Sequence, residues 1–443
     1  MILTEAGAAQ LARMTRDGEL SAVELAEACL ARIDTREAEI CAWIHFDRDL
    51  VRRQAEDLDA GRAAGAPCGT LHGIPVGVKD IFDTADLPTE NGTALLAGRR
   101  PDRDAMAVRL LREAGAVIMG KTVTTELAMG ASGKTRNPHN PAHTPGGSSS
   151  GSAAAVADFM VPLALGTQTA GSVIRPAAYC GVVGYKPSYG SISRQGVLAD
   201  SPFFDTIGVF ARSVEDAALI GDVMTRYDPA DPAMRLAAAP NLQATAMADP
   251  PVEPRFAFVK TAAWDQAEAT TREAFEAFAG RLGDRCAEIT LPDSFDAAWE
   301  LHRIIVDVDL AKNFARLYEA GPDGLSERLR VRIERGRDIR ALDYNRALEA
   351  RPDFNAHLDG IFARYDAIIT PATAGEAPAG LESTGDPVFN ALWTYCGLPA
   401  VSLPLLAGPN GLPLGVQLVG RRGDDARLLR TARWLTERVS PTN

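Results

Sequence analysis

Two serines in glycine-rich segments and one lysine at the end of an apolar run are the residues whose types and spacing could do chemistry. Ser148 lies in the segment Pro145–Ser152, Ser172 follows a second bend that contains glycine, and Lys79 follows the apolar run Gly73–Val78. A serine hydroxyl becomes a strong nucleophile when an adjacent base removes its proton, and a neutral lysine can be the base. These residues predict acyl transfer without histidine, and amide hydrolysis in particular.

A second nucleophile motif is present but lacks its base. Gly147–Gly151 matches the pattern G-x-S-x-G, in which Ser149 would be the nucleophile. That arrangement needs a downstream histidine, and the candidates, His302 and His357, lie in helical surroundings without any other catalytic signal. The glycine-rich run also lacks the Gly-Lys-Ser/Thr ending of a phosphate-binding loop.

Several motifs together carry a family resemblance. The runs Gly-Gly-Ser-Ser-Ser-Gly-Ser, Ala-Gly-Ser-Val-Ile-Arg-Pro-Ala and Gly-Ile-Pro-Val-Gly-Val-Lys-Asp resemble those of the amidase signature family. Three C-terminal stretches are also similar to it: Asp366–Pro371, Gly397–Pro404 and Gly411–Gly420. Each motif alone is weakly specific, but all of them in this order are highly specific. The resemblance covers nearly everything except roughly residues 225–360.

The resemblance implies that Ser172 is the nucleophile. It assigns the oxyanion hole to the backbone of Thr169, Ala170, Gly171 and Ser172, where one hydrogen-bond donor is typically worth about 2.7–4 kcal/mol in the transition state. The chain departs from the usual pattern at two positions. It has Ala170 where most relatives have glycine, and Gln168 where many have aspartate. Without the resemblance, a helix-capping role for Ser172 would be equally open.

The resemblance also implies that Ser148 relays the proton from Ser172 to Lys79. The peptide bond before Ser148 is cis in the family, and Ser150 and Thr167 are expected to hydrogen-bond around the pair. A free lysine has a pKa of about 10.4, so Lys79 must be buried to be neutral and act as a base. A lone lysine at a strand end more commonly extends to solvent, and that alternative stays open.

Arg175 follows the proposed nucleophile in the segment Ser-Val-Ile-Arg-Pro. Two roles are open for its guanidinium group. It could form an ion pair that holds the loop, or it could clamp a substrate carboxylate through two hydrogen bonds. Many relatives carry arginine two residues after the serine rather than three. The pattern here resembles the malonamidase-type branch of the family, which implies small amides that bear a carboxylate.

No metal or cofactor is predicted. His139 and His143 have the spacing of two metal ligands on one helical turn. Pro138 and Pro141 disfavour a helix at this place, and no third ligand is evident.

Composition limits the classes of partner. The net charge of −12 and the absence of a Lys/Arg cluster argue against nucleic acid. No apolar run is long enough to span a membrane, and the first residues lack the pattern of a signal peptide. We therefore expect a cytoplasmic protein with reduced cysteines, whose partner is a small amide, with a homodimer left open as its assembly.

Strands and helices that alternate along the chain must position these residues. Short apolar runs predict strands near 74–79, 115–120, 161–165, 366–370, 399–404 and 414–419. Helices are predicted from the capping box at Ser21 and over 104–114. We expect an α/β fold in one large domain, residues 1–443, with a central mixed sheet covered by helices on both faces. Within it, residues 225–360 are expected to be variable, mainly helical, and to cover the active-site entrance.

The function predicted from these observations is an amidohydrolase that cleaves a small carboxamide to a carboxylate and ammonia. Two alternatives remain open. One is the glutaminase subunit of a tRNA-dependent amidotransferase, which shares this fold and needs a partner chain. The other is a non-catalytic binding protein on the same scaffold, against which the complete set Lys79, Ser148 and Ser172 argues.

Overall fold

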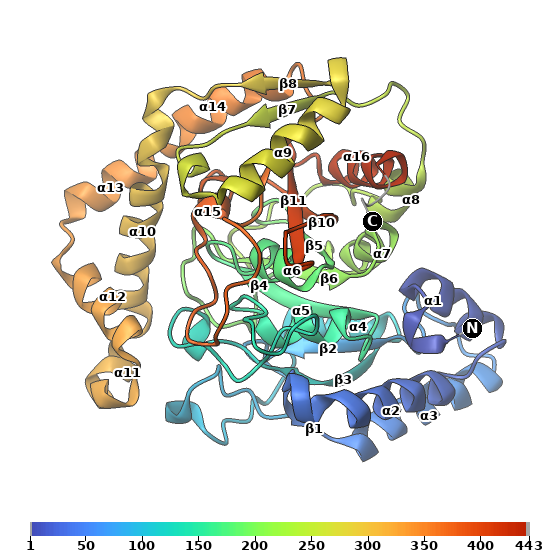
Figure 1. Cartoon of the computed structure of the whole chain (residues 1–443). Coiled ribbons are helices and arrows are strands. Elements are labelled where there is room, and N and C mark those ends of the chain that lie inside the picture. Colours follow the sequence, from blue (N-terminus) through green and yellow to red (C-terminus); the bar gives the residue numbers. More distant parts are fainter. Residues whose placement is uncertain (1, 440–443) are drawn as a thin grey trace.

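A single mixed sheet organises the protein, whose computed structural model describes residues 2–439 (Figure 1). The sheet has 11 strands in the order β1-β3-β2-β4-β6-β5-β10-β11-β9-β7-β8. The strands are β1 (Trp43–Phe46), β2 (Pro75–Lys79), β3 (Val117–Thr122), β4 (Leu163–Gln168), β5 (Val183–Lys186), β6 (Thr206–Ala211), β7 (Phe256–Val259), β8 (Cys286–Ile289), β9 (Ala367–Pro371), β10 (Ala400–Ala407) and β11 (Pro413–Val419).

Helices connect and cover these strands (Figure 1). The α-helices are α1 (Ala8–Asp17), α2 (Ala22–Ile40), α3 (Arg48–Ala63), α4 (Met106–Glu113), α5 (Ser150–Ala157), α6 (Ile174–Cys180), α7 (Val214–Met224), α8 (Leu242–Met247), α9 (Ala269–Arg281), α10 (Ala298–Asn313), α11 (Ala315–Ala320), α12 (Glu327–Asp338), α13 (Ala341–Glu349), α14 (Arg351–Phe362), α15 (Val388–Tyr395) and α16 (Asp425–Arg438). Short 3₁₀ helices occur at Leu3–Glu5, Ala94–Leu96, Glu126–Ala128, Trp264–Gln266, Gly283–Arg285, Asp293–Ala297 and Pro322–Gly324.

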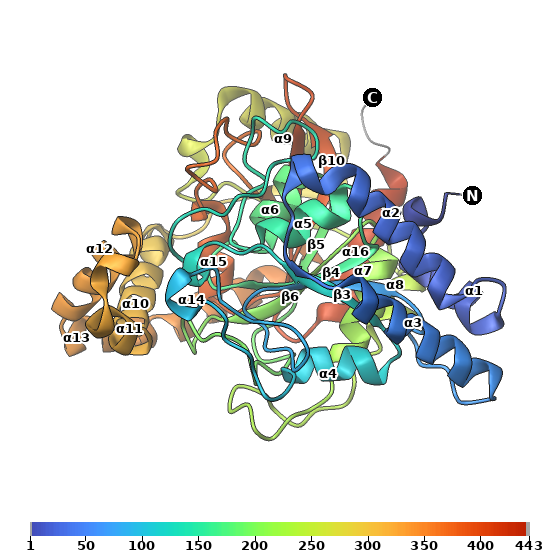
Figure 2. The same cartoon turned by 90° about the horizontal axis from the view of Figure 1, so that it is seen from below.

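Both faces of the sheet are covered, which confirms the predicted α/β fold. Helices α5 and α6 pack on one face, and α7 and α16 pack on the other (Figure 2). Every residue of β2, β3, β4 and β6 is buried as a result. A strand covered on both sides needs apolar residues at successive positions rather than alternate ones, and such runs are the pattern from which most of these segments were predicted.

The pairing of β2 with β4 decides where chemistry can occur. The two strands are parallel neighbours, with Val76 opposite Leu163 and Val78 opposite Leu165. Parallel neighbours end at the same edge of a sheet, so Lys79, the last residue of β2, lies close to the last residues of β4. The loop that contains Ser172 begins where β4 ends at Gln168. We call this the catalytic edge: the carboxyl ends of β2 and β4 with the loops that follow them.

Helices α10–α13 form a helical group on one side of the sheet in both views (Figures 1 and 2). A second hydrophobic cluster joins apolar side chains of the region 225–360, among them Ile305, Leu329 and Phe354, to strand residues such as Ile368 and Val419. The region 225–360 is mainly helical, and it also contributes the strands β7 and β8, which the sequence analysis did not predict. Each has only four residues, too few for a clear period.

None of the helices within residues 2–439 combines the length and the apolar character that crossing a membrane would require.

Candidate active site

Lys79 is buried at the end of β2 and lies between two hydroxyl groups. Its Nζ is 2.7 Å from Ser148 Oγ and 2.9 Å from Thr167 Oγ1. Lys79 is fully buried, because α5 and the neighbouring strands surround β2. No carboxylate forms an ion pair with it among the described residues. The structure therefore brings the predicted pair, Lys79 and Ser148, into direct contact and excludes the solvent-exposed alternative for this lysine.

Burial also sets the charge of this lysine. Removal from water lowers the pKa of the Lys79 amine to about 7, although the negative charges of Asp200 and Asp205 raise it in part. A large fraction of the amine is therefore neutral near pH 7. A neutral amine has a lone pair and can accept a proton from the hydroxyl 2.7 Å away.

The loop before α5 holds Ser148 by contacts of its neighbours. The peptide bond Gly147–Ser148 is cis. Ser150 Oγ donates a hydrogen bond of 2.7 Å to the carbonyl oxygen of Gly146. Ser150 thus bonds to the backbone of its own loop, whereas the expectation was a hydrogen bond around the Lys79–Ser148 pair. Thr167, the other predicted supporting residue, contacts Lys79 directly.

Ser172 lies in a bend whose backbone donors are free. Its side chain is 7% exposed, and its Oγ has no hydrogen-bond partner among residues 2–439. The amide N–H groups of Thr169, Ala170, Gly171 and Ser172 likewise find no acceptor within that part of the chain. Adjacent free N–H groups next to a hydroxyl have the composition of an oxyanion hole. Ser172 and Ser148 line the same cavity, without a hydrogen bond between them.

The hydrogen bonds of Gln168 give a reason for glutamine at a position where many relatives have aspartate. Its Oε1 accepts hydrogen bonds from the N–H groups of Val173 (2.9 Å) and Ile174 (3.0 Å), and its Nε2 donates to Thr394 Oγ1 (2.9 Å). Thr394 Oγ1 is in turn 2.7 Å from the carbonyl oxygen of Ala170. An ionised aspartate could only accept hydrogen bonds, whereas an amide also donates. Gln168 therefore joins α15 to the bend before Ser172.

His302, which the sequence analysis left without a role, contacts the same bend. Its Nε2 lies 2.8 Å from the carbonyl oxygen of Thr169. A carbonyl only accepts, so Nε2 is the protonated nitrogen. The ring stacks between Phe204 (4.7 Å between centroids) and Trp299 (5.8 Å), and burial lowers the pKa of the imidazole to about 4. No sequence signal marked this residue, because its partner lies 133 residues away.

Arg175 is buried, 5% exposed, and has no carboxylate ion pair among the described residues. Its Nη2 donates to the carbonyl oxygen of Gly147 (2.6 Å) and lies 3.3 Å from Thr384 Oγ1. The loop-holding role is therefore met by a backbone carbonyl and not by the ion pair that was one of the two expectations. Its Nε and Nη1 have no hydrogen-bond partner among residues 2–439. Burial lowers the pKa of the guanidinium to about 10, so it stays charged at pH 7.

A front cavity of about 440 Å³ gives access to both serines. Helices α10 and α12 of the helical group and the segment 383–387 form its walls. Five arginines line it: Arg175, Arg303, Arg328, Arg332 and Arg335. The only acidic side chain among its lining residues is Asp386. This wall composition favours a negatively charged ligand.

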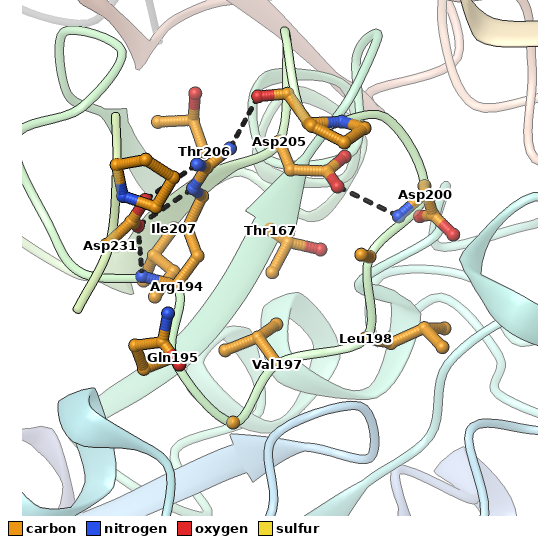
Figure 3. A pocket seen from close by; sticks show the side chains of 14 residues that line it. Thr167, Arg194, Gln195, Val197, Leu198, Asp200, Asp205, Thr206, Ile207 and Asp231 are labelled. Carbon is orange, nitrogen blue, oxygen red and sulfur yellow. Dashed lines mark hydrogen bonds and ion pairs between the residues drawn. The ribbon is translucent and has the colours of Figure 1, made fainter. Parts of the chain in front are cut away.

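A second cavity of about 260 Å³, which we call the rear cavity, is lined by Thr167, Asp200 and Asp205 (Figure 3). Thr167 lines this cavity and contacts Lys79, whereas Ser148 lines the front cavity. Asp205 also lines the rear cavity. Its Oδ1 accepts from Thr169 Oγ1 (2.6 Å), and its Oδ2 accepts from the N–H of Asp200 (2.8 Å). Burial raises the pKa of the Asp205 carboxyl to about 6.

The histidines considered as metal ligands have other partners. His139 Nε2 lies 2.9 Å from the carbonyl oxygen of Cys180, and His143 Nδ1 lies 2.6 Å from that of Ala377. Over residues 2–439 no group of three or more His, Cys, Asp or Glu side chains is arranged to hold a metal ion.

Known proteins are similar to this chain in sequence and in fold. A family model described as Amidase matches residues 24–429. Two relatives are subunits of glutamyl-tRNA(Gln) amidotransferases. The one from Chloroflexus aggregans is 36% identical over 93% of this chain and 92% of its own length, and the one from Symbiobacterium thermophilum is 36% identical over 98% and 96%.

Solved structures of similar chains have the same fold. A chain of a vestigial complex related to the origins of an s-triazine catabolic enzyme superposes with a TM-score of 0.91 at 27% identity, covering 99% of this chain and 100% of that one. Peptide amidase from Stenotrophomonas maltophilia superposes with a TM-score of 0.84 at 29% identity over 99% and 98%. The chain therefore belongs to the amidase signature family and is a hydrolase of amide C–N bonds.

Proposed function

We propose that this enzyme hydrolyses a small carboxamide to a carboxylate and ammonia through an acyl-enzyme on Ser172. The observation that supports this most is the contact of 2.7 Å between Lys79 Nζ and Ser148 Oγ, in a cavity that also contains Ser172. Lys79 is the base, and Ser148 transfers to it the proton of Ser172.

The reaction follows from these positions. Ser172 Oγ attacks the amide carbonyl while its proton passes through Ser148 to Lys79. The free N–H groups of Thr169, Ala170, Gly171 and Ser172 are the candidates that stabilise the oxyanion of the tetrahedral intermediate. The protonated lysine then returns its proton through Ser148 to the leaving nitrogen, and ammonia departs. Water, activated by the same relay, cleaves the acyl-enzyme and restores Ser172.

The substrate that we propose bears a carboxylate, as in the malonamidase-type branch. Arg175 is the candidate clamp, since it is charged, lines the front cavity and has two unpartnered nitrogens. A charge-assisted hydrogen bond contributes about 1.5–3 kcal/mol. Residues 225–360 shape this selectivity by covering the entrance, because Trp299, Arg303 and Arg328 from this region line the cavity.

A second candidate function is the glutaminase subunit of a tRNA-dependent amidotransferase. The relatives with 36% identity over more than 90% of both chains bear the name of such an amidotransferase and favour it. Glutamine is itself a small carboxamide with a carboxylate, so the chemistry at Ser172 would be the same. The two candidates differ in assembly: a homodimer suffices for the first, whereas the second requires a partner chain. Both would act in the cytoplasm.

Ammonia release from an amide panel tests the proposal. The panel contains malonamate, succinamate, glutamine and a neutral amide of equal length for each. We expect turnover of the carboxylated members, none with Ser172→Ala, and a serine-directed inhibitor attached to the Ser172 peptide by mass spectrometry. An adduct on Ser148 or Ser149 would refute the assignment. Glutamine turnover that appears only with a copurifying chain in size exclusion would favour the second candidate.

A further inference from the structure

The arginines of the front cavity come mainly from one helix. Arg328, Arg332 and Arg335 of α12 all line the cavity, and their spacing places them on one face of the helix. Arg303 of α10 lines it as well. Arg330, on the same helix, does not line the cavity and pairs with Asp323 (3.4 Å).

Most of these charges are balanced by carboxylates. Asp307, which is fully buried, accepts from Arg332 Nε (2.9 Å) and Arg335 Nε (2.5 Å). Arg303 Nε donates to Glu300 Oε2 (2.8 Å). One buried aspartate thus fixes two guanidinium groups side by side, and these pairs form a rigid wall rather than free binding groups.

Arg328 differs from its neighbours on α12. It has neither a hydrogen bond nor an ion pair with any residue between 2 and 439. Asp386 is the acidic residue whose charge acts on it, but the two do not approach within the 4.0 Å of an ion pair. Arg332 opposes it with a like charge. Arg328 therefore presents an unneutralised cation to the cavity, at the exposed end of α12.

Two arginines without a carboxylate partner, Arg175 and Arg328, therefore line one cavity, one of them buried and the other exposed. Arg175 is buried near Ser172, and Arg328 is exposed on the covering helix. The chain as a whole has a net charge of −12, so a positive cavity is a local exception and not a consequence of composition. A cleft lined by one sign of charge concentrates ligands of the opposite sign.

We propose that Arg328 is a second anion-binding position, so that the preferred substrates are amides with two anionic groups. The substrate carboxylate beside the scissile amide binds at Arg175. The second anionic group, at the other end of the substrate, binds at Arg328. This inference rests on the proposed function for the position of the amide. It adds a residue and a substrate class that the chemistry at Ser172 does not require.

Equilibrium binding of unreactive acids tests the second position separately from catalysis. Succinate, glutarate and adipate are compared by calorimetry with monocarboxylates of the same chain length, on the wild type, Arg328→Gln and the matched control Arg330→Gln. We expect at least one dicarboxylate to bind about tenfold or more tightly than its monocarboxylate in the wild type. Arg328→Gln should remove that difference and leave monocarboxylate binding unchanged, whereas Arg330→Gln should preserve both.

Equal affinity of mono- and dicarboxylates in the wild type would overturn the proposal. An equal loss in Arg328→Gln and Arg330→Gln would also overturn it, because it would indicate only a general effect of charge. Arg328-dependent dicarboxylate binding by a wild type that hydrolyses no amide would refute the proposed function and retain the subsite. Turnover of monoanionic amides without any preference for dicarboxylates in binding would retain the proposed function and refute the second anion-binding position.

Discussion

The catalytic edge and the helical group differ in how they hold their polar residues. At the catalytic edge, Lys79 and Ser148 are buried, and each contacts a neutral hydroxyl or amine. In the helical group, carboxylates hold most of the arginines that line the front cavity, as Asp307 holds Arg332 and Arg335, and Arg328 is the exception. Neutral partners in a dry site allow a proton to move between them, whereas ion pairs fix charge in place. This difference agrees with the proposal that chemistry occurs at the edge and that the helices select the substrate.

One hydrogen bond joins these two regions directly at the nucleophile. His302 of α10 reaches the carbonyl oxygen of Thr169, in the bend before Ser172. If chemistry and selectivity are truly separate, substitutions at the edge should alter kcat and its pH dependence, and substitutions on the helices should alter KM. His302 is the place where this division should fail.

The largest effect is expected at the base. Lys79→Ala should reduce kcat by several orders of magnitude, because no other group can accept the proton from Ser148. In the wild type only neutral Lys79 is active, and its pKa is lowered to about 7, so the rate should rise with pH through about 7 and level off above it. A pH–rate profile from pH 5 to 9 measures this.

Lys186→Met is the matched control for that change. Lys186 is equally buried, and burial lowers its pKa to about 7, but it donates to the carbonyl oxygens of Pro187 and Leu398. Its loss should leave the pH profile of the remaining activity unaltered. A flat profile in the wild type, or equal losses in both variants, would argue against a lysine base.

An intermediate effect is expected where the two regions meet. His302→Leu removes the donor to Thr169 and should lower kcat about tenfold with KM nearly unchanged, since one buried hydrogen bond lost costs about 1–3 kcal/mol. His302→Gln places an amide nitrogen near the position of Nε2 and should restore most of the rate. Rescue by glutamine is the decisive readout. If both variants lose activity equally, the stacking with Phe204 and Trp299 matters and the hydrogen bond does not.

The smallest effect on activity is expected from a substitution of Asp205, which lines the rear cavity. Asp205 is ionised above about pH 6, and its charge raises the pKa of Lys79. Asp205→Asn should therefore shift the midpoint of the pH–rate profile to lower pH and raise activity at pH 6, by about threefold at most. The asparagine side chain can still hydrogen-bond with Thr169 Oγ1.

Asp231→Asn serves as its control. Asp231 lines the same rear cavity but is paired with Arg194 at 2.7 Å (Figure 3). Its neutralisation should not move the midpoint. A midpoint that stays in place in Asp205→Asn, or moves upward, would contradict the electrostatic account of how Lys79 is tuned.

Strand prediction succeeded where burial on both faces leaves continuous apolar runs. The runs predicted near 74–79, 161–165 and 414–419 are the strands β2, β4 and β11, with ends that differ by a few residues. The strands β1, β5, β7 and β8 were missed, because each has four residues and short runs carry no clear period. Strand β6 was missed as well, although all six of its residues are buried, and an interior glycine is not the reason because the predicted strands β2 and β11 also contain one.

The sequence by itself singled out the residues to which we assign the chemistry. Lys79, Ser148 and Ser172 were identifiable because each lies in a short motif of glycines or apolar residues. Such a motif can be recognised from adjacent residues alone. The bend before Ser172 and the apolar character of β2 are likewise local consequences of those residues.

Only the tertiary structure decided which distant residues complete the site. His302 meets Thr169 across 133 residues, Gln168 meets Thr394 across 226, and the arginines of α12 converge on Arg175 only because the helical group packs beside the sheet. Such contacts depend on how helices pack, and many sequences satisfy one packing geometry, so no local pattern predicts them. The same packing removes Lys79 from water, and that desolvation, rather than the residue type, lowers the pKa of the lysine to about 7.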